Sequence, residues 1–551
     1  MLQFSSLFAV ADKPPAWRMH VLIAGVLAAF GAVIWQLSAI GNDNAASPRI
    51  MSSGSQIRHA ISRPDTVDRN GVILASDVRM YWLFADPSQI LSVDDAAEKL
   101  AVVLKGEDEN ELRKRLAGPG RFAWIKRGIT PIAANAVHNL GLPGLYIIQE
   151  PQRAYPAGAT AVHILGHTNI DNEGQAGIEK FIDTSPRVIK QAEKLGDRPR
   201  LQLSVDLRVQ YALYEELTAA VKLYKAKAAG AVVLDVTSGE VIALAGLPDY
   251  DPNRREESLR KGLHNRFYYD AYELGSVFKT LTVAMALDEG IVSTRDHINV
   301  KTPLRMGRFT IRDNHARTAT MTPKEIFTHS SNTGAARLAL MAGAKRQLSF
   351  FKKLGLTQTA ETELGPTARP LIPDPWREIN TMTAAYGHGI SVPPFTFAVA
   401  VAALINGGYK IEPTFLPRSR AEGRSHAVKV LHADTSAIMR DYFRANVKHG
   451  TGRRANVPGY RVGGKTGTAF KPVDGKYSKA VISSFIAAFP MDKPQYLVFV
   501  VLDEPKPANP RENTNASYNA VPTTGKIIGR IAPMLGIAPA RTFDETAQAS
   551  Y

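Results

Sequence analysis

The first residues whose types and spacing suggest chemistry are Ser276 and Lys279, which lie three positions apart. They begin an apolar run over residues 276–289 flanked by Gly275 and Gly290, which predicts a buried helix with both side chains on one face. A serine hydroxyl becomes a nucleophile when a base removes its proton, and a lysine kept neutral by burial is such a base. Backbone N–H groups at the helix start would stabilise charge on the attacked carbonyl. We therefore expect an acylatable serine here.

Two further groups of polar residues follow this serine in the chain. Ser330 and Asn332 stand in a loop that we expect between two helical patterns. Residues 465–468, Lys-Thr-Gly-Thr, lie in a strand pattern. A glycine in a strand lets a substrate approach closely, and a lysine with two threonines suits a carboxylate ligand. A serine–lysine pair alone is a weak signal, and residues 349–352 repeat it, so the three ordered groups together carry the argument.

Length, composition and charge limit the classes to which the protein can belong. A chain of 551 residues with 45% hydrophobic and 21% charged residues implies several globular domains. The net charge of +16 permits nucleic acid, anionic lipid or an anionic polymer as a neighbour. Basic residues are spread along the chain and no nucleic-acid-binding motif accompanies them, so we expect no nucleic acid. The absence of cysteine excludes disulfides, thiolate zinc sites and a cysteine nucleophile.

The amino-terminal region contains one long apolar segment. Residues 1–20 form a polar head, and residues 21–40 run without a charge, long enough to cross a bilayer core of about 30 Å. A cleaved signal peptide is the alternative, although its apolar core would usually be shorter. We expect an uncleaved transmembrane anchor, which leaves the rest of the chain on one side of the membrane.

The remaining chain divides into two regions and a tail. Residues 41–202 are mixed, with short strands expected at 71–74 and 80–84 and helices near 94–104 and 131–140. Residues 203–540 begin with a hairpin over 222–245, continue through helices, and return to strands at 460–469, 480–488 and 496–502 before a helix at 524–535. This order predicts an α+β fold whose antiparallel sheet is closed by both ends of the region. A polar tail, residues 541–551, completes the chain.

The three ordered groups resemble the motifs of penicillin-binding proteins and serine β-lactamases: Ser-x-x-Lys at residue 276, Ser-x-Asn at residue 330 and Lys-Thr-Gly at residue 465. Residues 63–71, 153–158 and 177–179 resemble the amino-terminal region of class B, monofunctional penicillin-binding proteins, with Pro64 where that family usually has glycine. The surroundings of residues 272–279 and 122–145 are most similar to the division-specific, FtsI-type branch (penicillin-binding protein 3-like). The resemblance implies a transmembrane helix, an elongated pedestal of dimerisation type and a β-lactamase-like transpeptidase domain.

This resemblance implies a role for each motif residue. Ser276 would attack the penultimate D-Ala carbonyl of a peptidoglycan stem peptide, with Lys279 as general base and the terminal D-Ala as leaving group. Ser330 would pass the proton to the leaving amine, and Asn332 would hold the substrate amide and Lys279.

The third motif would bind the substrate and complete the oxyanion hole. Lys465, Thr466 and Thr468, with Gly467 between them, would bind the terminal carboxylate. The backbone N–H groups of Ser276 and Thr468 would form the oxyanion hole, in which a single donor contributes about 3 kcal/mol. No metal or cofactor enters this chemistry.

The resemblance also implies a cellular location and a set of partners. The enzyme would sit in the bacterial inner membrane with its catalytic domain on the periplasmic side, and would cross-link septal peptidoglycan. Its expected partners are stem peptides ending in D-Ala-D-Ala, β-lactam antibiotics, a glycosyltransferase and other division proteins. An elongation-type transpeptidase, and a penicillin sensor or non-catalytic scaffold, are the alternatives.

Three competing patterns are less consistent with the sequence. Residues 459–466 fit a P-loop, but glycine and proline follow where a P-loop requires a helix. Residues 361–365 resemble the deacylating loop of class A β-lactamases, with Gly365 in place of its asparagine. His163 and His167 are four apart but lack a third ligand, so we expect a structural role rather than a zinc site.

Overall fold

The structure, a computed structural model, describes residues 26–34, 63–186, 200–307, 309–313, 318–473 and 476–540. The chain separates into two units, Met1–Ala60 and Ile61–Tyr551, and the second holds all the elements discussed below. Of the expected anchor at 21–40, only residues 26–34 are described, and they form an exposed helical segment. Within these described ranges no helix is long and apolar enough to cross a membrane.

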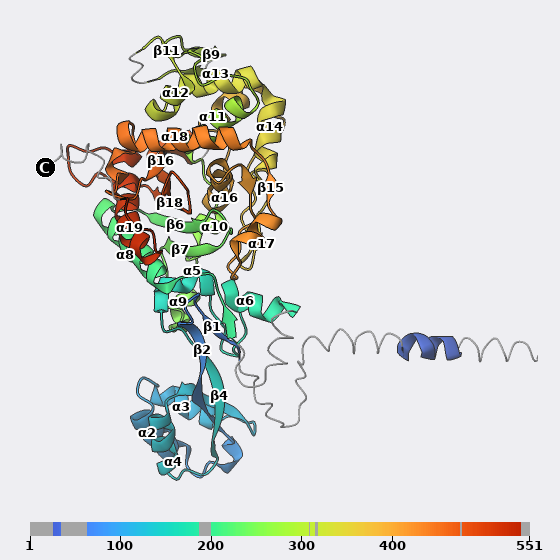
Figure 1. The fold of residues 1–551 in the computed structure, drawn as a ribbon. Coiled ribbons are helices and arrows are strands. Elements are labelled where there is room, and N and C mark those ends of the chain that lie inside the picture. The colour runs from blue at the N-terminus through green and yellow to red at the C-terminus, as the bar shows by residue number, and fades with distance from the viewer. Residues whose placement is uncertain are drawn as a thin grey trace, which may run out of the picture. The chain divides into compact units, whose positions relative to one another are not determined.

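The amino-terminal part of the second unit is built on a five-stranded sheet in the order β3-β2-β1-β5, with β4 also paired to β2. Its strands are β1 (Asp65–Val67), β2 (Ile73–Ala85), β3 (Ala123–Ile129), β4 (Leu145–Ala154) and β5 (Arg200–Gln202). Helices α2 (Val93–Val103), α3 (Glu109–Leu116) and α4 (Pro131–Asn139) pack on it, as Figure 1 shows. The two expected helices are confirmed. The two short strands expected at 71–74 and 80–84 are instead parts of one strand, β2, which begins at Ile73.

Each of these three helices begins where a short polar side chain can accept a backbone hydrogen bond. The side chains of Ser92, Asp108 and Thr130 accept from the N–H three residues on. The helices bury their apolar faces with Leu83 of β2 and Ile125 of β3 in a small core. The remaining short elements here are η1 (Pro87–Gln89), η2 (Gly158–Ala161), α5 (Val162–Leu165) and α6 (Gly177–Thr184).

A group of buried charges joins β1, β2, β4 and α6. The guanidinium of Arg153 lies 2.7 Å from a carboxylate oxygen of Glu179 and 3.2 Å from one of Asp77. Arg63 reaches the other oxygen of Glu179 at 2.9 Å and Asp183 at 2.6 Å. The three sequence segments that resemble the class B amino-terminal region therefore meet in one ion-pair network.

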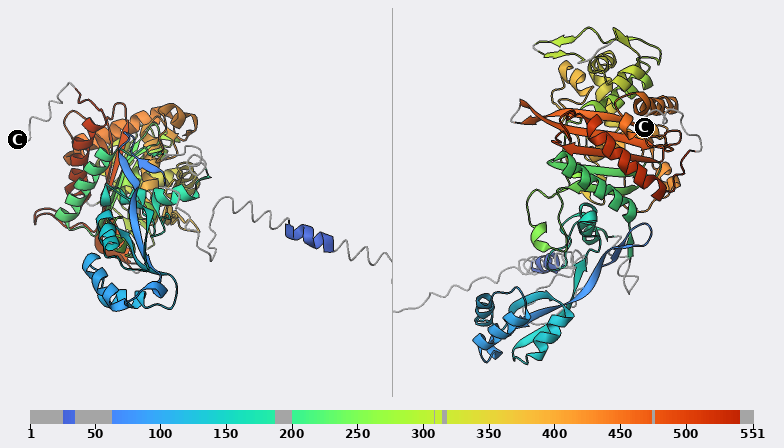
Figure 2. Two further views of the ribbon diagram at one scale, coloured as in Figure 1. Left: turned by 90° about the horizontal axis from the view of Figure 1, so that it is seen from below. Right: turned by 90° about the vertical axis from the view of Figure 1, so that its left-hand side faces the viewer.

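The carboxy-terminal part of the second unit contains another five-stranded sheet, in the order β16-β17-β18-β6-β7, with every neighbouring pair antiparallel. Its strands are β6 (Ala228–Asp235), β7 (Val241–Leu247), β16 (Gly463–Val473), β17 (Lys476–Phe489) and β18 (Tyr496–Asp503). The pairing of β18 with β6 confirms the prediction that the two ends of the region close one sheet. Helices α8 (Leu207–Tyr224) and α19 (Ala520–Met534) pack on this sheet in one core, as the right-hand view of Figure 2 shows.

Helix α8 corrects the predicted start of the first hairpin. The carboxylate of Asp206 caps the helix, and Val209, Leu213 and Leu217 are buried on one face of it. Residues 222–224 therefore end a helix, and the hairpin strand begins only at Ala228.

Helices cover the opposite face of the sheet and surround Ser276. They include η3 (Gly275–Phe278), α11 (Lys279–Asp288), α12 (Pro323–His329), α13 (Asn332–Ala342), α16 (Pro394–Ile405) and α18 (Ala433–His449). The expected single helix over 276–289 is thus a 3-10 turn followed by an α-helix that starts at Lys279. Shorter elements complete the region: α9 (Arg255–Ser258), α10 (Arg266–Tyr269), β8 (Ile298–Asn299), β9 (Leu304–Met306), β10 (Phe309–Ile311), β11 (Thr320–Met321), α14 (Ala344–Lys353), β12 (Glu361–Thr362), β13 (Gly365–Pro366), α15 (Glu378–Ala384), β14 (Tyr409–Lys410), α17 (Arg420–Ser425), β15 (Val428–Lys429), η4 (Arg453–Ala455) and η5 (Ala516–Tyr518).

Candidate active site

Ser276 lies in the tight turn η3, which two glycines hold against neighbouring backbone. Gly275 has φ +63° and Gly387 has φ +79°, and the N–H of Gly275 donates to the carbonyl of Gly387 at 3.2 Å. A Cβ atom on Gly387 would lie 2.3 Å from the Gly275 oxygen, and one on Gly275 would lie 2.6 Å from the Thr468 oxygen. Side chains at these positions would push the turn away from β16, so the glycines fix where the serine hydroxyl sits.

Lys279, at the start of α11, brings its amine to that hydroxyl from inside the protein. Its side chain is fully buried, and Nζ lies 2.8 Å from Oγ of Ser276. Nζ also lies 2.7 Å from the carbonyl oxygen of Ser330, 2.7 Å from Oδ1 of Asn332 and 3.0 Å from Oγ of Ser330. The first two motifs predicted from the sequence therefore meet at one nitrogen atom.

Ser330 lies between α12 and α13 in a conformation that is uncommon for a residue with a side chain. Its φ is +59°, in the left-handed region, where it ends α12 and turns its hydroxyl towards the two lysines. Asp313 stabilises the start of α13. It accepts bonds from the Ser331 hydroxyl and from the backbone N–H groups of Asn332 and Thr333.

Strand β16 supplies the third motif. Nζ of Lys465 is buried and lies 3.0 Å from Oγ of Ser330. Oγ1 of Thr466 lies 2.7 Å from Oγ1 of Thr451, and Oγ1 of Thr468 accepts from the N–H of Ala516 at 3.2 Å.

A further glycine sets how closely this strand approaches the nucleophile. A Cβ on Gly467 would lie 2.5 Å from the carbonyl oxygen of Leu274, just before the nucleophile turn. The strand and the turn are therefore packed backbone to backbone, which a side chain at this position would prevent.

Burial controls the charge of both active-site lysines. Desolvation, reinforced by the nearby Lys465, lowers the pKa of Lys279 well below its ordinary value, against a smaller opposing effect of Asp313. Burial lowers the pKa of Lys465 to about 7. A neutral amine at Lys279 is the form that can accept a proton from Ser276.

The competing sequence patterns do not build comparable sites. Ser349 and Lys352 are exposed on α14, and among the described residues no hydrogen bond joins either side chain to Ser330, Asn332 or Lys465. The carboxylate of Glu363 accepts bonds from the hydroxyl of Thr414 and the N–H of Phe415, so it is engaged within the protein.

The P-loop pattern and the histidine pair lie in the following surroundings. Residues 463–473 form strand β16, where a P-loop would have to begin a helix. His163 lies 3.3 Å from the carbonyl oxygen of Pro248, and His167 lies 2.8 Å from the hydroxyl of Tyr250. Each imidazole ring therefore has a hydrogen-bond partner within the protein.

Three further residues at this site were not found from the sequence. Asp313 and Gly387 act on motif residues that are distant in the chain, so no local spacing marks them. Glu273 stands three positions before Ser276, and its carboxylate accepts bonds from the hydroxyl of Tyr477 at 3.1 Å and the N–H of Gly389 at 3.0 Å. Burial raises the pKa of Glu273. A carboxyl group next to a serine–lysine pair was the only signal available for it.

Comparisons with known proteins agree with this arrangement. The family model for the penicillin binding protein transpeptidase domain matches residues 229–528, and the model for the penicillin-binding protein dimerisation domain matches residues 60–186. The chain belongs to the penicillin-binding proteins, and its two-domain organisation is that of class B.

The chain is also similar to individual members of this family. It is 38% identical over 491 residues to the probable peptidoglycan D,D-transpeptidase FtsI of Caulobacter vibrioides, which covers 86% of this chain and 82% of the relative. It is 29% identical to the peptidoglycan D,D-transpeptidase FtsI of Escherichia coli, over 95% of this chain and 93% of that one. The crystal structure of a peptidoglycan synthetase from Bifidobacterium adolescentis shares the fold, with a TM-score of 0.67 at 21% identity over 87% of this chain and 96% of that one.

Proposed function

We propose that this protein is a serine-type peptidoglycan D,D-transpeptidase that forms an acyl-enzyme on Ser276. The observation that carries the proposal is the buried amine of Lys279, 2.8 Å from the Ser276 hydroxyl, with its pKa held far below the ordinary value. Such an amine removes the hydroxyl proton as the oxygen attacks the penultimate D-Ala carbonyl of a stem peptide. The C–N bond to the terminal D-Ala then breaks, leaving an ester on Ser276.

The hydrogen bonds of Lys279 suit this role. A neutral amine has two N–H donors and one lone pair, and the carbonyl oxygen of Ser330 and Oδ1 of Asn332 accept the two donors. The lone pair is then available to the Ser276 hydroxyl. Oγ of Ser330 lies 3.0 Å from Nζ of Lys279, which supports the passage of the proton through Ser330 to the leaving amine. Asn332 also holds the amide of the substrate.

Strand β16 binds the end of the substrate in this mechanism. Lys465, Thr466 and Thr468 bind the terminal carboxylate, and Gly467 allows the close approach of the strand. The backbone N–H groups of Ser276 and Thr468 stabilise the oxyanion. The contact of Gly275 with the Thr468 carbonyl supports this pairing, because it holds the nucleophile turn against the strand.

An amine of a second stem peptide completes the reaction. It attacks the ester carbonyl, the bond to Oγ of Ser276 breaks, and Oγ recovers a proton, so that a new amide cross-links the two peptides. A β-lactam places its strained amide where the D-Ala carbonyl lies and remains attached to Ser276.

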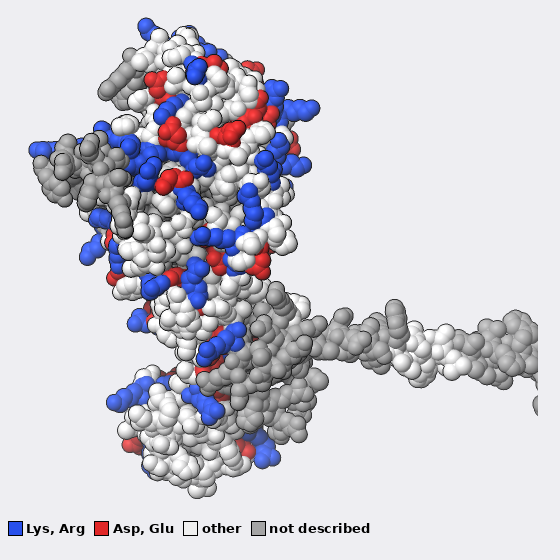
Figure 3. Space-filling model, in the orientation of Figure 1, with Lys and Arg blue, Asp and Glu red and all other residues white. Residues whose placement is uncertain are grey.

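We also propose a membrane location and a role in cell division for this protein. Residues 21–40 anchor the chain in the inner membrane after a short cytoplasmic head at 1–20, a pedestal covers 41–202, and the transpeptidase domain covers 203–540 on the periplasmic side before a tail at 541–551. The work is septal, in cell division, with a glycosyltransferase and other division proteins as partners. Lysine and arginine side chains are spread over many elements of the visible face in Figure 3, which does not favour a nucleic-acid partner.

Labelling with a fluorescent penicillin tests the proposal. The wild-type protein should become labelled, and Ser276→Ala should not. The exposed serine of the second Ser-x-x-Lys pattern provides the matched control, because Ser349→Ala should label like the wild type. Label that persists on Ser276→Ala would contradict the assignment. To test the septal role, the protein is depleted from cells: filaments are expected, and rounded cells would contradict it.

A further inference from the structure

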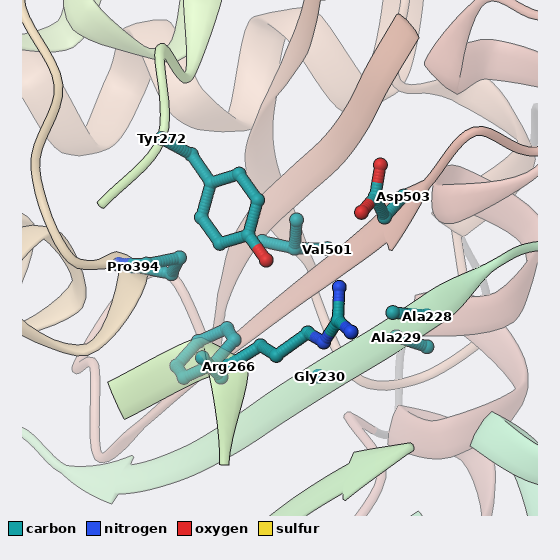
Figure 4. A pocket seen from close by; sticks show the side chains of 9 residues that line it. Ala228, Ala229, Gly230, Arg266, Tyr272, Pro394, Val501 and Asp503 are labelled. Carbon is teal, nitrogen blue, oxygen red and sulfur yellow. The ribbon is translucent and has the colours of Figure 1, made fainter. Parts of the chain in front are cut away.

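A recess lined by charged side chains lies next to the nucleophile turn. Its larger part has a volume of about 420 Å³ and is lined by residues from α10, β16, β18 and the chain around residue 370. A smaller depression adjoins it and shares Arg266, Tyr272 and Asp503 with it. Figure 4 shows the side chain of Arg266 extended along this depression, with the Tyr272 hydroxyl pointing towards its guanidinium group.

The acidic groups of this recess already have partners. Both carboxylate oxygens of Asp503 accept from Nζ of Lys471, at 2.8 and 3.0 Å. The carboxylate of Asp270 lies 2.7 Å from Nε2 of His264. Neither carboxylate therefore serves as the ion-pair partner of an arginine in the recess.

Two arginines in the recess lack such partners. Among the residues that the structure describes, no hydrogen bond or ion pair engages the guanidinium group of Arg266 or Arg369. Nε of Arg266 is buried without a hydrogen-bond acceptor. A buried N–H group of a guanidinium is costly to leave unpaired, and a carboxylate is the acceptor that an arginine pair binds best. The recess therefore has the chemistry of a carboxylate site.

The recess lies within reach of a peptide held at Ser276. Tyr272 is four residues before the nucleophile, and Lys471 is three residues beyond Thr468 on β16. At no more than about 3.6 Å per residue, these distances along the chain are at most ~14 Å and ~11 Å. A peptide of three or four extended residues spans the same length.

The proposed chemistry also sets the direction in which the donor peptide extends. Its terminal carboxylate is held at Lys465 and its reacting carbonyl at the N–H of Thr468, so the rest of the peptide continues along β16 towards Lys471. We propose that Arg266 and Arg369 bind a carboxylate on the donor stem peptide, upstream of its D-Ala-D-Ala end. This inference rests on the proposed transpeptidase function and adds a specificity site to it.

Two synthetic donors test the inference. Both are pentapeptides ending in D-Ala-D-Ala, and they differ only in one upstream side chain, a free carboxylate in one and a carboxamide in the other. The measurement is kcat/KM for release of the terminal D-Ala by the full-length protein. The wild type should prefer the carboxylate donor by about tenfold or more, the range of a charge-assisted hydrogen bond. Equal rates for the two donors in the wild type would overturn the proposal.

Matched variants separate binding from a general effect on the fold. Arg369→Gln, at an exposed position, and Arg266→Gln should slow only the carboxylate donor, so that the preference is lost. Arg79→Gln removes a positive charge from an exposed position on β2 and should leave both rates unchanged. Equal slowing of both donors by Arg369→Gln would contradict carboxylate binding.

Two further measurements show whether the arginines bind the donor or the acceptor peptide, and whether the protein is a transpeptidase. If the variants leave donor rates unchanged but reduce transfer to an acceptor amine that carries a carboxylate, the donor assignment is wrong. Labelling by fluorescent penicillin should be equal in the wild type and Arg369→Gln. If the wild type is not labelled, the transpeptidase proposal fails, whatever the preference between donors.

Discussion

Lys279 and Lys465 come from different motifs, yet their amine nitrogens lie at the same distance, 3.0 Å, from the hydroxyl oxygen of Ser330. Both side chains are buried, and each protonated amine would raise the cost of protonating the other. One lysine can therefore stay neutral to accept a proton while the other stays charged to bind a carboxylate. The shared hydroxyl lies on the path between them.

The rate of acylation should depend on pH in a bell-shaped manner. Lowering the pH protonates Lys279, which abolishes the general base, so kcat/KM falls on the acid side. Raising the pH above about 7 removes the proton from Lys465, so binding of the substrate carboxylate weakens and kcat/KM falls again. The two limbs belong to the coupled pair. Following a peptide donor from acidic to alkaline pH measures both limbs. A flat profile would contradict the assignment of the two charge states.

Gly387→Ala should impair the nucleophile without touching any catalytic side chain. The added Cβ would meet the Gly275 backbone at 2.3 Å and displace the turn that carries Ser276. A displacement of about 1 Å at a reacting atom costs on the order of 100-fold in rate. Gly290→Ala is the matched control, because Gly290 also has a positive φ but has open space around its Cβ position. Acylation by fluorescent penicillin should fall only in the first variant, and equal rates would count against the role of the turn.

Asp313→Asn should slow acylation by about tenfold or more, since a charged acceptor of three hydrogen bonds is replaced by a neutral amide. The loss acts through the position of Asn332, so the rate of acylation should fall while the melting temperature of the unlabelled protein changes little. Asp296→Asn is the control, because Asp296 also accepts bonds from a serine hydroxyl and a backbone N–H, in an exposed turn. If both variants acylate like the wild type, Asp313 does not position the loop.

Arg153→Met should destabilise the amino-terminal region. The side chains of Arg153 and Glu179 are fully buried. Removal of Arg153 leaves Glu179 with Arg63 as its remaining ion-pair partner, so the buried network is short of one positive charge, which costs about 3–5 kcal/mol. Unfolding followed by circular dichroism measures the loss. The double variant Arg153→Met with Glu179→Leu should recover part of it, because one negative charge is removed together with Arg153 and Arg63 keeps its ion pair with Asp183. Arg113→Met, which breaks an exposed pair, should leave the melting temperature nearly unchanged.

The features that could be predicted from the sequence are those marked by residue type and spacing. The order of Ser276, Ser330 and Lys465 predicted one site, and the structure brings these three residues together. The closure of the sheet also followed from strands at both ends of the region. These features depend on local patterns, which the sequence displays directly.

Other features depend on contacts between distant residues that no local pattern records. The approach of Gly387 to Gly275, and the cap that Asp313 provides for α13, exist only once the helices have packed. The amino-terminal motifs were recognisable, but the buried network of Arg63, Arg153 and Glu179 appears only when β1, β4 and α6 are side by side. Helix α8 was missed because the strand pattern was extended back over its last turn.

The strand order of the catalytic sheet has a consequence for how the protein is made. Strands β6 and β7 are synthesised near the start of the region, but β6 pairs with β18, whose last residue is Asp503. During synthesis, Ser276 and Lys279 therefore leave the ribosome long before Lys465 and strands β17 and β18 exist. The site around this pair is completed only when almost the whole domain is present, so a partly made chain carries Ser276 and Lys279 but not Lys465 or the strand on which it lies.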